Sequence, residues 1–403
     1  MDIYDKRVAI LFEKLKEKNA ALIVSAGQLI LRNGDVYHPF RVSSDFYYLT
    51  GLEEPDLVAI FIKQEYSIKK ILIILDPPEI KRKWDSSWIL RKNSFEIQSY
   101  DKVVSWDEEL KIQEIMQEAS QYSIGLIGFD HSKISSDFFA QSNILNVLPI
   151  LAELRLEKSS EEIEIMRNIN QLSSSIYQKM YQQPKGKWVN EADIEGFWLS
   201  EGRSLGLQFQ AYPPIIAGGE RACCLHYHHN NKSLENKNIV LIDAGYELNN
   251  YASDITRMLF LKKPEGLLKA LYDLVLETQE SIISSIMPGV TLLTLQEKTK
   301  ILLAQGLLDL NLAQGSLEKV LQEDLPKYYP HSIGHHLGLD VHDGIGVIGL
   351  KDKPLKKNMM ITVEPGLYFE EYGWGIRIED NILVTSSGFE NITTAPKKLD
   401  DIL

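Results

Sequence analysis

The sequence is poor in cysteine, and the two that it has, Cys223 and Cys224, are adjacent. Adjacent residues cannot form an ordinary disulfide with each other, because the bond geometry needs a wider separation of the two backbones. Neither belongs to a CxxC pair, so we expect both to be small buried apolar residues. A chain without disulfides suits a reducing compartment, which favours the cytoplasm.

The sequence also lacks a long apolar run and an excess of positive charge. No stretch approaches the roughly 20 apolar residues that span a bilayer, and charges scattered over residues 1–27 argue against a signal peptide. The net charge is -13, from 43 basic and 56 acidic residues, whereas binding to a nucleic-acid backbone needs clustered Lys and Arg. We therefore expect neither a membrane nor a nucleic-acid partner.

The composition is that of an ordinary soluble protein, and 403 residues suffice for two or three domains. Up to about residue 150, strand-like runs such as "AALIVSAG" and "KKILIIL" alternate with polar helical ones such as "DEELKIQEIMQEAS", which is typical of an α/β domain. In "LEKSSEEIEIMRNINQ", Ser159 or Ser160 is an N-cap, and Ile163 and Met166 follow at helical spacing. A second domain is therefore predicted to begin there.

Beyond residue 160 the sequence shows a faint internal duplication. Each half has a helix, a turn with Pro and Gly, and a second helix, as in "QPKGKWVNEADIEGFW" and "MPGVTLLTLQEKTKIL". An apolar strand that ends in an acid and a glycine follows later in each half, "IVLIDAG" and "MMITVEPG". After a polar turn comes a strand with another acid beside an arginine, "SDITRMLF" and "GIRIEDNILV". This predicts two similar halves, each a helix pair with a hairpin bearing two carboxylates.

The acids of these hairpins are Asp243, Asp254, Glu364 and Glu379. Asp243 and Glu364 have apolar neighbours on both faces, and Asp254 and Glu379 repeat the problem on the partner strands. Strands that are apolar on both faces are buried. A lone buried carboxylate costs several kcal/mol unless it is paired. Any one of the four could be a solvated strand end, but all four in a duplicated layout require a source of positive charge.

The arginines beside these acids, Arg257 and Arg377, supply at most two positive charges. Two divalent cations would balance four carboxylates and accept both oxygen and imidazole ligands. The stretch "HSIGHHLGLDVHD" holds four of the nine histidines, broken by glycines. Here His335 would supply the nitrogen ligand, and His331 and His342 would line the same cavity.

At this point four ordered motifs, "IDAGYELNNYASDITR", "HSIGHHLGLDVHD", "ITVEPGLY" and "GIRIEDN", resemble those of the pita-bread metallopeptidases, and within them of aminopeptidase P, the Xaa-Pro aminopeptidases. The resemblance extends to "FRVSSDFYYLTGLEEPD" and "AYPPIIAGGERACCLHY", so it spans nearly the whole chain. It implies an α/β N-terminal domain, residues 1–155, for substrate access or oligomerisation. An α+β pita-bread catalytic domain with an internal pseudo-two-fold duplication, residues 156–403, would follow.

The resemblance further implies a dinuclear site in an enzyme that releases the first residue of peptides with proline in second position. Two divalent ions are expected, manganese first, with cobalt or zinc as alternatives. The partners would be peptides that begin Xaa-Pro and further copies of the chain, as a dimer or tetramer. The expected metal ligands are Asp243, Asp254, His335, Glu364 and Glu379.

The remaining expected roles concern catalysis and substrate. Glu364 is the candidate proton carrier, because a carboxylate beside the attacking water can accept its proton and pass it to the leaving amine. His342 would assist at the oxyanion, and Arg377 would orient the ligand carboxylates. His226 is expected to be a fourth catalytic residue. The substrate is expected to contact His226, His331, His342, Tyr368 and Asp45.

Two of these segments also have a plainer interpretation. In "CCLHYHHNN" only His226 matches the position expected to touch substrate, and His228 and His229 are expected to be bystanders. Asp45 in "SSDFYYLTG" would stand beside an aromatic strand, where a turn cap is the alternative role. The resemblance favours a place for Asp45 at the rim of an active site, in the same or a neighbouring subunit.

Three other interpretations compete with this one. A prolidase shares the fold and ligands but cleaves only Xaa-Pro dipeptides, and "SSDFYYLTG" resembles aminopeptidase P more. A creatinase-like hydrolase or a non-catalytic binding module would lack metal ligands that this sequence retains. "GIGVIG" matches a dinucleotide fingerprint on paper but follows a loop, and "HSIGH" lacks the glutamate of a zincin, so both are set aside.

Overall fold

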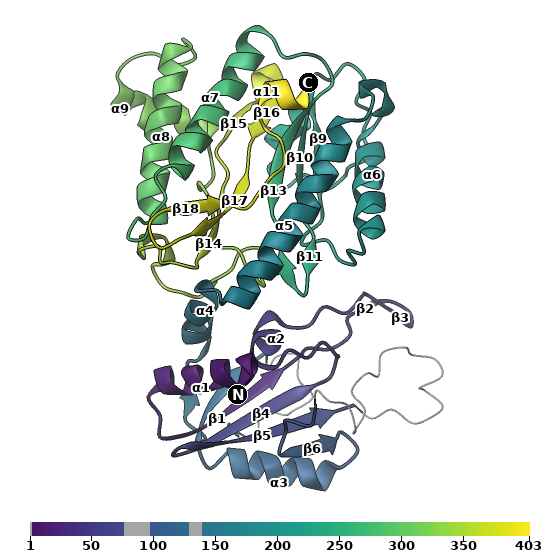
Figure 1. The fold of residues 1–403 in the computed structure, drawn as a ribbon, viewed down its shortest axis with the longest axis vertical. Coiled ribbons are helices and arrows are strands. Elements are labelled where there is room, and N and C mark those ends of the chain that lie inside the picture. Colours follow the sequence, from purple (N-terminus) through teal and green to yellow (C-terminus); the bar gives the residue numbers. More distant parts are fainter. Residues whose placement is uncertain (1, 76–96, 129–138) are drawn as a thin grey trace. The chain divides into compact units, whose positions relative to one another are not determined.

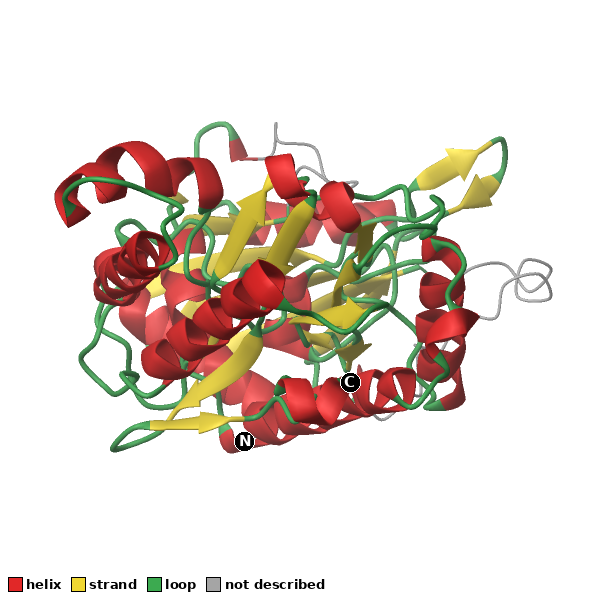
Figure 2. Ribbon diagram, turned by 90° about the horizontal axis from the view of Figure 1, so that it is seen from above, coloured by secondary structure: helices red, strands yellow, loops and turns green. Residues whose placement is uncertain are grey.

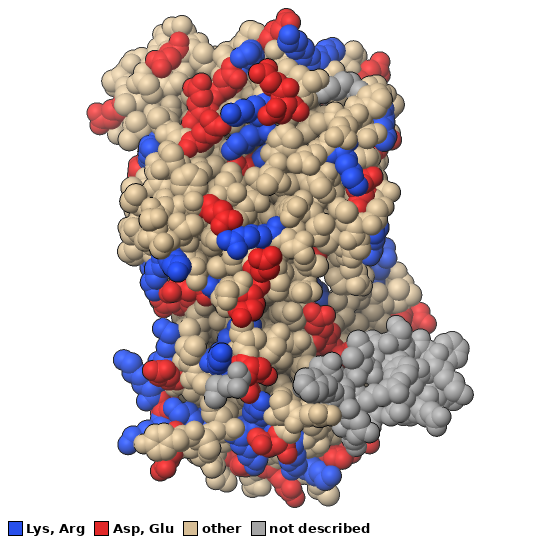
Figure 3. Space-filling model, in the orientation of Figure 1, with Lys and Arg blue, Asp and Glu red and all other residues tan. Residues whose placement is uncertain are grey.

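The structure, a computed structural model, describes residues 2–75, 97–128 and 139–403. The chain divides into two compact units, Met1–Leu154 and Arg155–Leu403 (Figure 1). Within the described ranges, no helix combines the length and apolarity that a membrane crossing requires. On the face drawn in Figure 3, acidic and basic side chains are interspersed, so this face presents no broad surface of one sign among the residues that the structure describes.

The N-terminal unit is built on a six-stranded mixed sheet in the order β6-β5-β4-β1-β7-β8. The central strands β5, β4 and β1 pair antiparallel, whereas β6, β7 and β8 add parallel. Burial on both faces explains why β1 and β4 read as continuous apolar runs. The elements are α1 (Ile3–Leu15), β1 (Asn19–Ser25), β2 (Leu31–Asn33), β3 (Val36–Tyr37), α2 (Ser44–Thr50), β4 (Val58–Gln64), β5 (Ser67–Ile74), β6 (Lys102–Ser105), α3 (Glu109–Ala119), β7 (Ser123–Ile127), β8 (Ile144–Leu145) and α4 (Leu148–Leu156).

The segment "SDFYYLT" forms the helix α2, so the expectation of an aromatic strand is wrong. Its aromatic residues favour a strand by propensity, but the segment is short, begins after Ser43 and ends at Gly51 in the left-handed conformation. Asp45 lies in the first turn, where an acid is favourable to the helix dipole.

The C-terminal unit repeats one arrangement twice, as the duplication predicted. Helices α5 and α6 precede the sheet β13-β10-β9, and helices α7 and α8 precede the sheet β14-β17-β18. In Figure 1, α5 and α6 lie on one side of the strands and α7 and α8 on the other. Figure 2 likewise shows strands, in yellow, flanked by helices, in red.

The elements of this unit are α5 (Ser160–Tyr181), α6 (Glu191–Ser204), β9 (Ile215–Gly218), β10 (Ile239–Ala244), β11 (Glu247–Leu248), β12 (Tyr251–Ala252), β13 (Ile255–Phe260), α7 (Gly266–Ile283), α8 (Leu292–Asp309), α9 (Leu317–Lys319), α10 (Leu325–Tyr328), β14 (Met360–Val363), β15 (Gly366–Phe369), β16 (Trp374–Arg377), β17 (Asp380–Val384), β18 (Phe389–Asn391) and α11 (Leu399–Ile402). Short 3-10 and π turns lie between them, including Gly219–Cys223.

Local signals determine where the long helices of this unit begin. Ser159, one of the two residues that the sequence offered, is the N-cap of α5, and it forms a capping box with Glu162. The α5 residues Ile163 and Met166 are buried at the predicted spacing. Helix α6 begins with the same device, a capping box that Asn190 forms with its third helical residue. These helices pack their apolar faces on the sheets and so hold the strands from which the site is built.

The two cysteines and the glycine-rich segment "GIGVIG" were also the subject of expectations. Cys223 is half-buried and Cys224 is exposed, so the expectation that both are buried is wrong. They lie at the end of a 3-10 turn, which leaves the second side chain outside the core. The "GIGVIG" segment, residues 344–349, is a loop in which Gly344, Gly346 and Gly349 have positive φ, which agrees with setting the dinucleotide fingerprint aside.

Candidate metal centre

The four acids singled out in the sequence lie at the ends of strands from both halves of the C-terminal unit. Asp243 is in β10, and Asp254 immediately precedes β13. Glu364 immediately follows β14, and Glu379 immediately precedes β17. Antiparallel pairing of β10 with β13, and of β14 with β17, brings each pair of acids to one end of its hairpin. All four line a single cavity of about 320 Å³.

The histidine segment reaches this cavity because it lies directly on β14. A Cβ on Gly334 would come 2.1 Å from the carbonyl oxygen of Thr362, so only glycine allows this close approach. The next residue, His335, donates its backbone N–H to Thr362 Oγ1 at 3.1 Å. Its ring Nδ1 is 3.1 Å from the carbonyl oxygen of His336. A donating Nδ1–H leaves Nε2 free as a ligand atom on the cavity side.

Three of the expected ligands already have metal-binding separations. Ligand atoms of Asp254, His335 and Glu379 all lie within 4.8 Å of one another. The Nε2 atom of His335 is 3.5 Å from an oxygen of Asp254 and 3.5 Å from an oxygen of Glu364. Carboxylates from strand ends and one imidazole form a set of oxygen and nitrogen donors that suits a divalent cation.

Fully ionised, the acids of the cavity would give it a strongly negative charge. Its described lining contains four carboxylates and one guanidinium, that of Arg377. Desolvation raises the pKa of Glu364 to about 7 and the pKa of Glu379 well above its usual range, and the neighbouring acids add to the effect at Glu379. Burial opposes the charged form of His335, but its contacts with Asp254 and Glu364 raise its pKa to about 9. Protons therefore occupy positions that divalent cations would fill, and the site is one for divalent metal.

Arg377 places its guanidinium beside these acids. Its guanidinium donates to Asp243 Oδ2 at 2.5 Å and to the Tyr368 hydroxyl at 2.9 Å. Its Nε donates to Thr256 Oγ1 at 3.1 Å, and that hydroxyl donates to Glu379 Oε2 at 2.7 Å. Arg377 thus contacts one acid directly and reaches another through a buried threonine.

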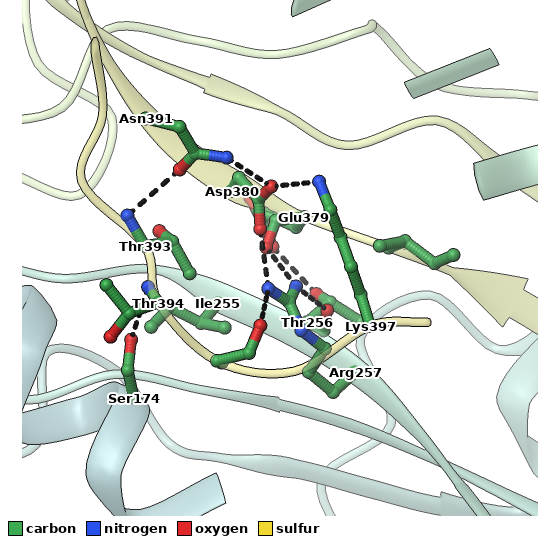
Figure 4. Close-up of polar contacts among 12 residues, drawn as sticks. Ser174, Ile255, Thr256, Arg257, Glu379, Asp380, Asn391, Thr393, Thr394 and Lys397 are labelled. Carbon is green, nitrogen blue, oxygen red and sulfur yellow. Dashed lines mark hydrogen bonds and ion pairs between the residues drawn. The ribbon is translucent and has the colours of Figure 1, made fainter. Parts of the chain in front are cut away.

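Arg257, the second of the two arginines beside the acids, does not line the cavity, so the upper limit of two positive charges falls to one guanidinium. It is buried and pairs with Asp380 at 2.6 Å, which also pairs with Lys397 at 2.6 Å. Figure 4 shows Asp380 between these two cations. Neighbouring residues on a strand point to opposite faces, and Thr256 faces the acids, so Arg257 points away from them. The described lining of the cavity is left with one guanidinium for four carboxylates.

Tyr212 was not foreseen as a site residue. Its hydroxyl lies 2.6 Å from Asp243 Oδ1 and 2.5 Å from Asp254 Oδ1, so one phenolic proton is shared between two carboxylates. Burial, followed by the charges of these two acids, raises its pKa well above the usual range, and the phenol stays protonated. Nothing in "QAYPP" signals this role. Thr256 could have been found, because it lies two residues after Asp254 and so on the same strand face.

Histidines other than His335 form a further part of the cavity lining, the histidine wall. His226, His331 and His342 all line the cavity, as expected, and so does His228, which was expected to be a bystander. The His342 ring lies against that of His335, with centroids 4.2 Å apart. Desolvation lowers the pKa of His342, and the positive charge of His335 adds to the effect, so the ring is neutral at pH 7.

His331 and Tyr368 form a second contact on this wall. His331 Nε2 is 2.8 Å from the Tyr368 hydroxyl, which also accepts from Arg377. Desolvation, reinforced by Arg377, lowers the pKa of His331 to about 4, so this imidazole is neutral too. Asp45 belongs to the N-terminal unit, and its expected role at the rim of the site stays a prediction.

This fold and this donor set define the pita-bread class of metal-binding enzymes. Residues 164–386 match metallopeptidase family M24, and residues 4–124 match the aminopeptidase P N-terminal domain. The chain belongs to metallopeptidase family M24.

Curated relatives and solved structures agree with this membership. The chain is 32% identical to the Xaa-Pro aminopeptidase of Haemophilus influenzae, over 99% of this chain and 96% of the relative. It is 29% identical to the Xaa-Pro aminopeptidase of Escherichia coli, over 98% and 95%. A zinc-substituted E. coli aminopeptidase P in complex with product matches with a TM-score of 0.89 at 27% identity, covering 99% of this chain and 96% of that one. Proline aminopeptidase P II from Yersinia pestis matches with a TM-score of 0.88 at 29% identity, covering 99% and 98%.

Proposed function

We propose that this chain is a metal-dependent aminopeptidase that releases the first residue from peptides with proline in second position. The observation that carries the proposal is the composition of the cavity. Four carboxylates and His335 line it, and the guanidinium of Arg377 is the one beside them in the described lining. Whole-length similarity to Xaa-Pro aminopeptidases supports the same activity.

The proposed metal ligands are Asp243, Asp254, His335, Glu364 and Glu379. Four carboxylates and one guanidinium leave three negative charges, which two divalent cations would more than balance. We propose manganese, because a ligand set with one imidazole and four carboxylates suits it, with cobalt and zinc as alternatives. The zinc-substituted E. coli relative is consistent with zinc as one of these. A bound pair of such ions supplies Lewis acidity, which polarises the scissile carbonyl and lowers the pKa of water.

Glu364 is the proposed proton carrier. Without metal, burial raises its pKa to about 7. A carboxylate beside the attacking water can accept the proton of that water and pass it on. Its Oε1 atom also accepts a 3.3 Å hydrogen bond from Thr362, which orients the carboxylate toward the cavity. In the proposed reaction it accepts a proton from the attacking water and transfers it to the leaving proline nitrogen. His342, a neutral imidazole in the wall, donates a hydrogen bond to the developing oxyanion.

The substrate is proposed to lie along the histidine wall. Pro213, Ile215 and Leu225 give this cavity apolar surface, against which a proline ring can pack. His226 and His331 would flank the ring, and the Tyr368 hydroxyl would hold His331 in place. A proline nitrogen carries no N–H in the peptide, so a site that recognises the ring instead of that donor favours Xaa-Pro bonds.

The choice between an aminopeptidase and a prolidase rests on charge. A prolidase must recognise the free carboxylate of the proline, which needs a cation beyond the ring. Among the described lining residues Arg377 is the one Arg or Lys, and it is engaged by Asp243, Thr256 and Tyr368. We therefore propose that peptides longer than two residues are the substrates.

Four further proposals concern the setting of the enzyme. We propose that residues 1–155 serve substrate access or oligomerisation, and that the chain forms a dimer or tetramer. Asp45 would then act at the rim of an active site. The free thiols of Cys223 and Cys224 are consistent with the proposed cytoplasmic location.

The test combines elemental analysis with a substrate series. The purified protein is freed of metal by prolonged chelation, reloaded with manganese, and assayed on an Xaa-Pro dipeptide, tripeptide and tetrapeptide. Chelation is expected to abolish turnover, manganese to restore it, and kcat/KM to be far higher for the longer peptides, each tenfold ratio reporting about 1.4 kcal/mol. Full turnover by protein verified as metal-free would remove the metal mechanism, and a preference for the dipeptide would make the enzyme a prolidase.

A further inference from the structure

Glu191 is a buried carboxylate that the proposed mechanism does not use. It is the first residue of α6 and is 0% exposed. Its Oε1 atom accepts from the Gly218 N–H at 3.0 Å and from Arg221 Nε at 2.5 Å. Its Oε2 atom accepts from the Tyr227 hydroxyl at 2.8 Å and from the Lys232 N–H at 2.9 Å. Four donors thus converge on one carboxylate.

These donors belong to residues 218–232, the segment that contains His226 of the cavity lining. Gly218 ends β9, Tyr227 is the neighbour of His226, and Lys232 lies at the far end of the same segment. Between Gly218 and Lys232, the regular structure is one 3-10 turn, so side-chain bonds must set the path of the backbone. Glu191 therefore ties the beginning, the middle and the end of the segment to the start of one helix.

A carboxylate suits this position better than any neutral group. An ionised carboxylate accepts about four hydrogen bonds and donates none, which matches the four donors that face it. Burial of the charge is compensated by Arg221 and by the N-terminus of α6. A glutamine would keep the shape but would turn an N–H₂ group toward existing donors. Glu191→Gln is therefore a specific test of the carboxylate.

We propose that Glu191 is a positioning residue that holds His226 in the cavity through Tyr227 and so sets the recognition of the substrate's second residue. This proposal rests on the proposed function, because it takes the peptide to lie along the histidine wall. The contact runs from the Glu191 carboxylate to the Tyr227 hydroxyl, and from Tyr227 to the preceding residue along the backbone. Desolvation and the bond to Glu191 raise the Tyr227 pKa to about 12, so the hydroxyl stays a donor at neutral pH.

The experiment compares Glu191→Gln and Tyr227→Phe with Glu201→Gln in the metal-loaded enzyme. Glu201 lies on the same helix but pairs with Lys179 at the surface, so it is matched for charge and helix. For an Xaa-Pro-Yaa tripeptide, we expect KM to rise about tenfold in the first two variants, with a smaller change in kcat, and no change in Glu201→Gln. Tyr227→Phe removes one hydroxyl and leaves the buried charge pair intact, so it tests the contact even if Glu191→Gln fails to fold.

A double-mutant cycle then separates positioning from a general loss of stability. In a His226→Ala background, Tyr227→Phe should have little further effect on KM, because the residue it positions is gone. Equal effects of Tyr227→Phe with and without His226, or an unchanged KM in Tyr227→Phe, would overturn the proposal. An inactive wild-type enzyme would instead count against the proposed function, so the two failures are distinguishable.

Discussion

Thr256→Val should weaken the metal site without changing any ligand. The Thr256 side chain is 0% exposed, donates to Glu379 Oε2 at 2.7 Å and accepts from Arg377 Nε at 3.1 Å. Valine keeps the shape and removes the hydroxyl, so a carboxyl acceptor and a charged donor each lose a partner. A hydrogen bond to a charged group contributes about 1.5–3 kcal/mol and a neutral one about 1 kcal/mol, so we expect the metal-free protein to lose roughly 2 to 4 kcal/mol of unfolding free energy.

The same change should lower metal affinity about 10- to 100-fold, the usual effect of removing a group that orients a ligand. Metal affinity is measured by calorimetric titration of the metal-free protein, and stability by chemical denaturation. Thr299→Val is the matched control, because Thr299 is equally buried but its hydroxyl bonds the carbonyl of Leu295 within α8. It should leave metal affinity unchanged. Wild-type metal affinity in Thr256→Val would refute the idea that Arg377 and Glu379 are coupled through this hydroxyl.

Three further outcomes are expected. Glu364→Gln removes the proton acceptor but keeps its shape, so kcat should fall about 10² to 10⁴-fold with the fold intact by circular dichroism, and a near wild-type rate would exclude Glu364 as the proton carrier. Tyr212→Phe removes the proton shared by Asp243 and Asp254, so calorimetry should show roughly tenfold weaker metal binding, whereas unchanged affinity would make this contact incidental. Without metal the pKa is about 7 for Glu364 and about 9 for His335, so metal binding must displace protons, and affinity should rise as the pH rises through these two values. Titration in two buffers of different ionisation enthalpy counts the protons, and a pH-independent affinity would contradict the assignment.

The grouping of the acids could be predicted from the sequence because acidic residues inside apolar runs can be recognised from their immediate neighbours. Asp243 and Glu364 stand in apolar runs of the sequence, so their neighbours in the chain already show that burial without a partner would be costly. The duplication placed both at corresponding hairpins. The fold class followed from the same periodicities and from the resemblance of the motifs, and it is confirmed by the match to the E. coli and Y. pestis structures.

What the sequence did not predict depended on long-range geometry. The partners of Arg257 follow from which strand face it occupies and from segments more than 120 residues away, as its bonds to Asp380 and Ala395 show. Tyr212 meets two acids that lie 31 and 42 residues further along, and no local pattern reports such a meeting. In α2 the aromatic residues favour a strand by propensity. The segment forms a helix instead, which begins after Ser43 and ends at Gly51.

The bonds of Arg257 have a consequence for the synthesis of the chain. Its guanidinium, buried at the junction of the two halves, donates to Asp380 and to the carbonyls of Ala395 and Pro396, all of which leave the ribosome long after it does. The first half therefore emerges with an arginine that cannot yet be buried, since a charge without its partners is strongly unfavourable in a core. Synthesis of β17 and of the segment after β18 therefore supplies the partners that let Arg257 be buried. A nascent chain arrested before residue 395 would present this unfinished junction to cellular proteases and chaperones, whereas the full-length product would conceal it.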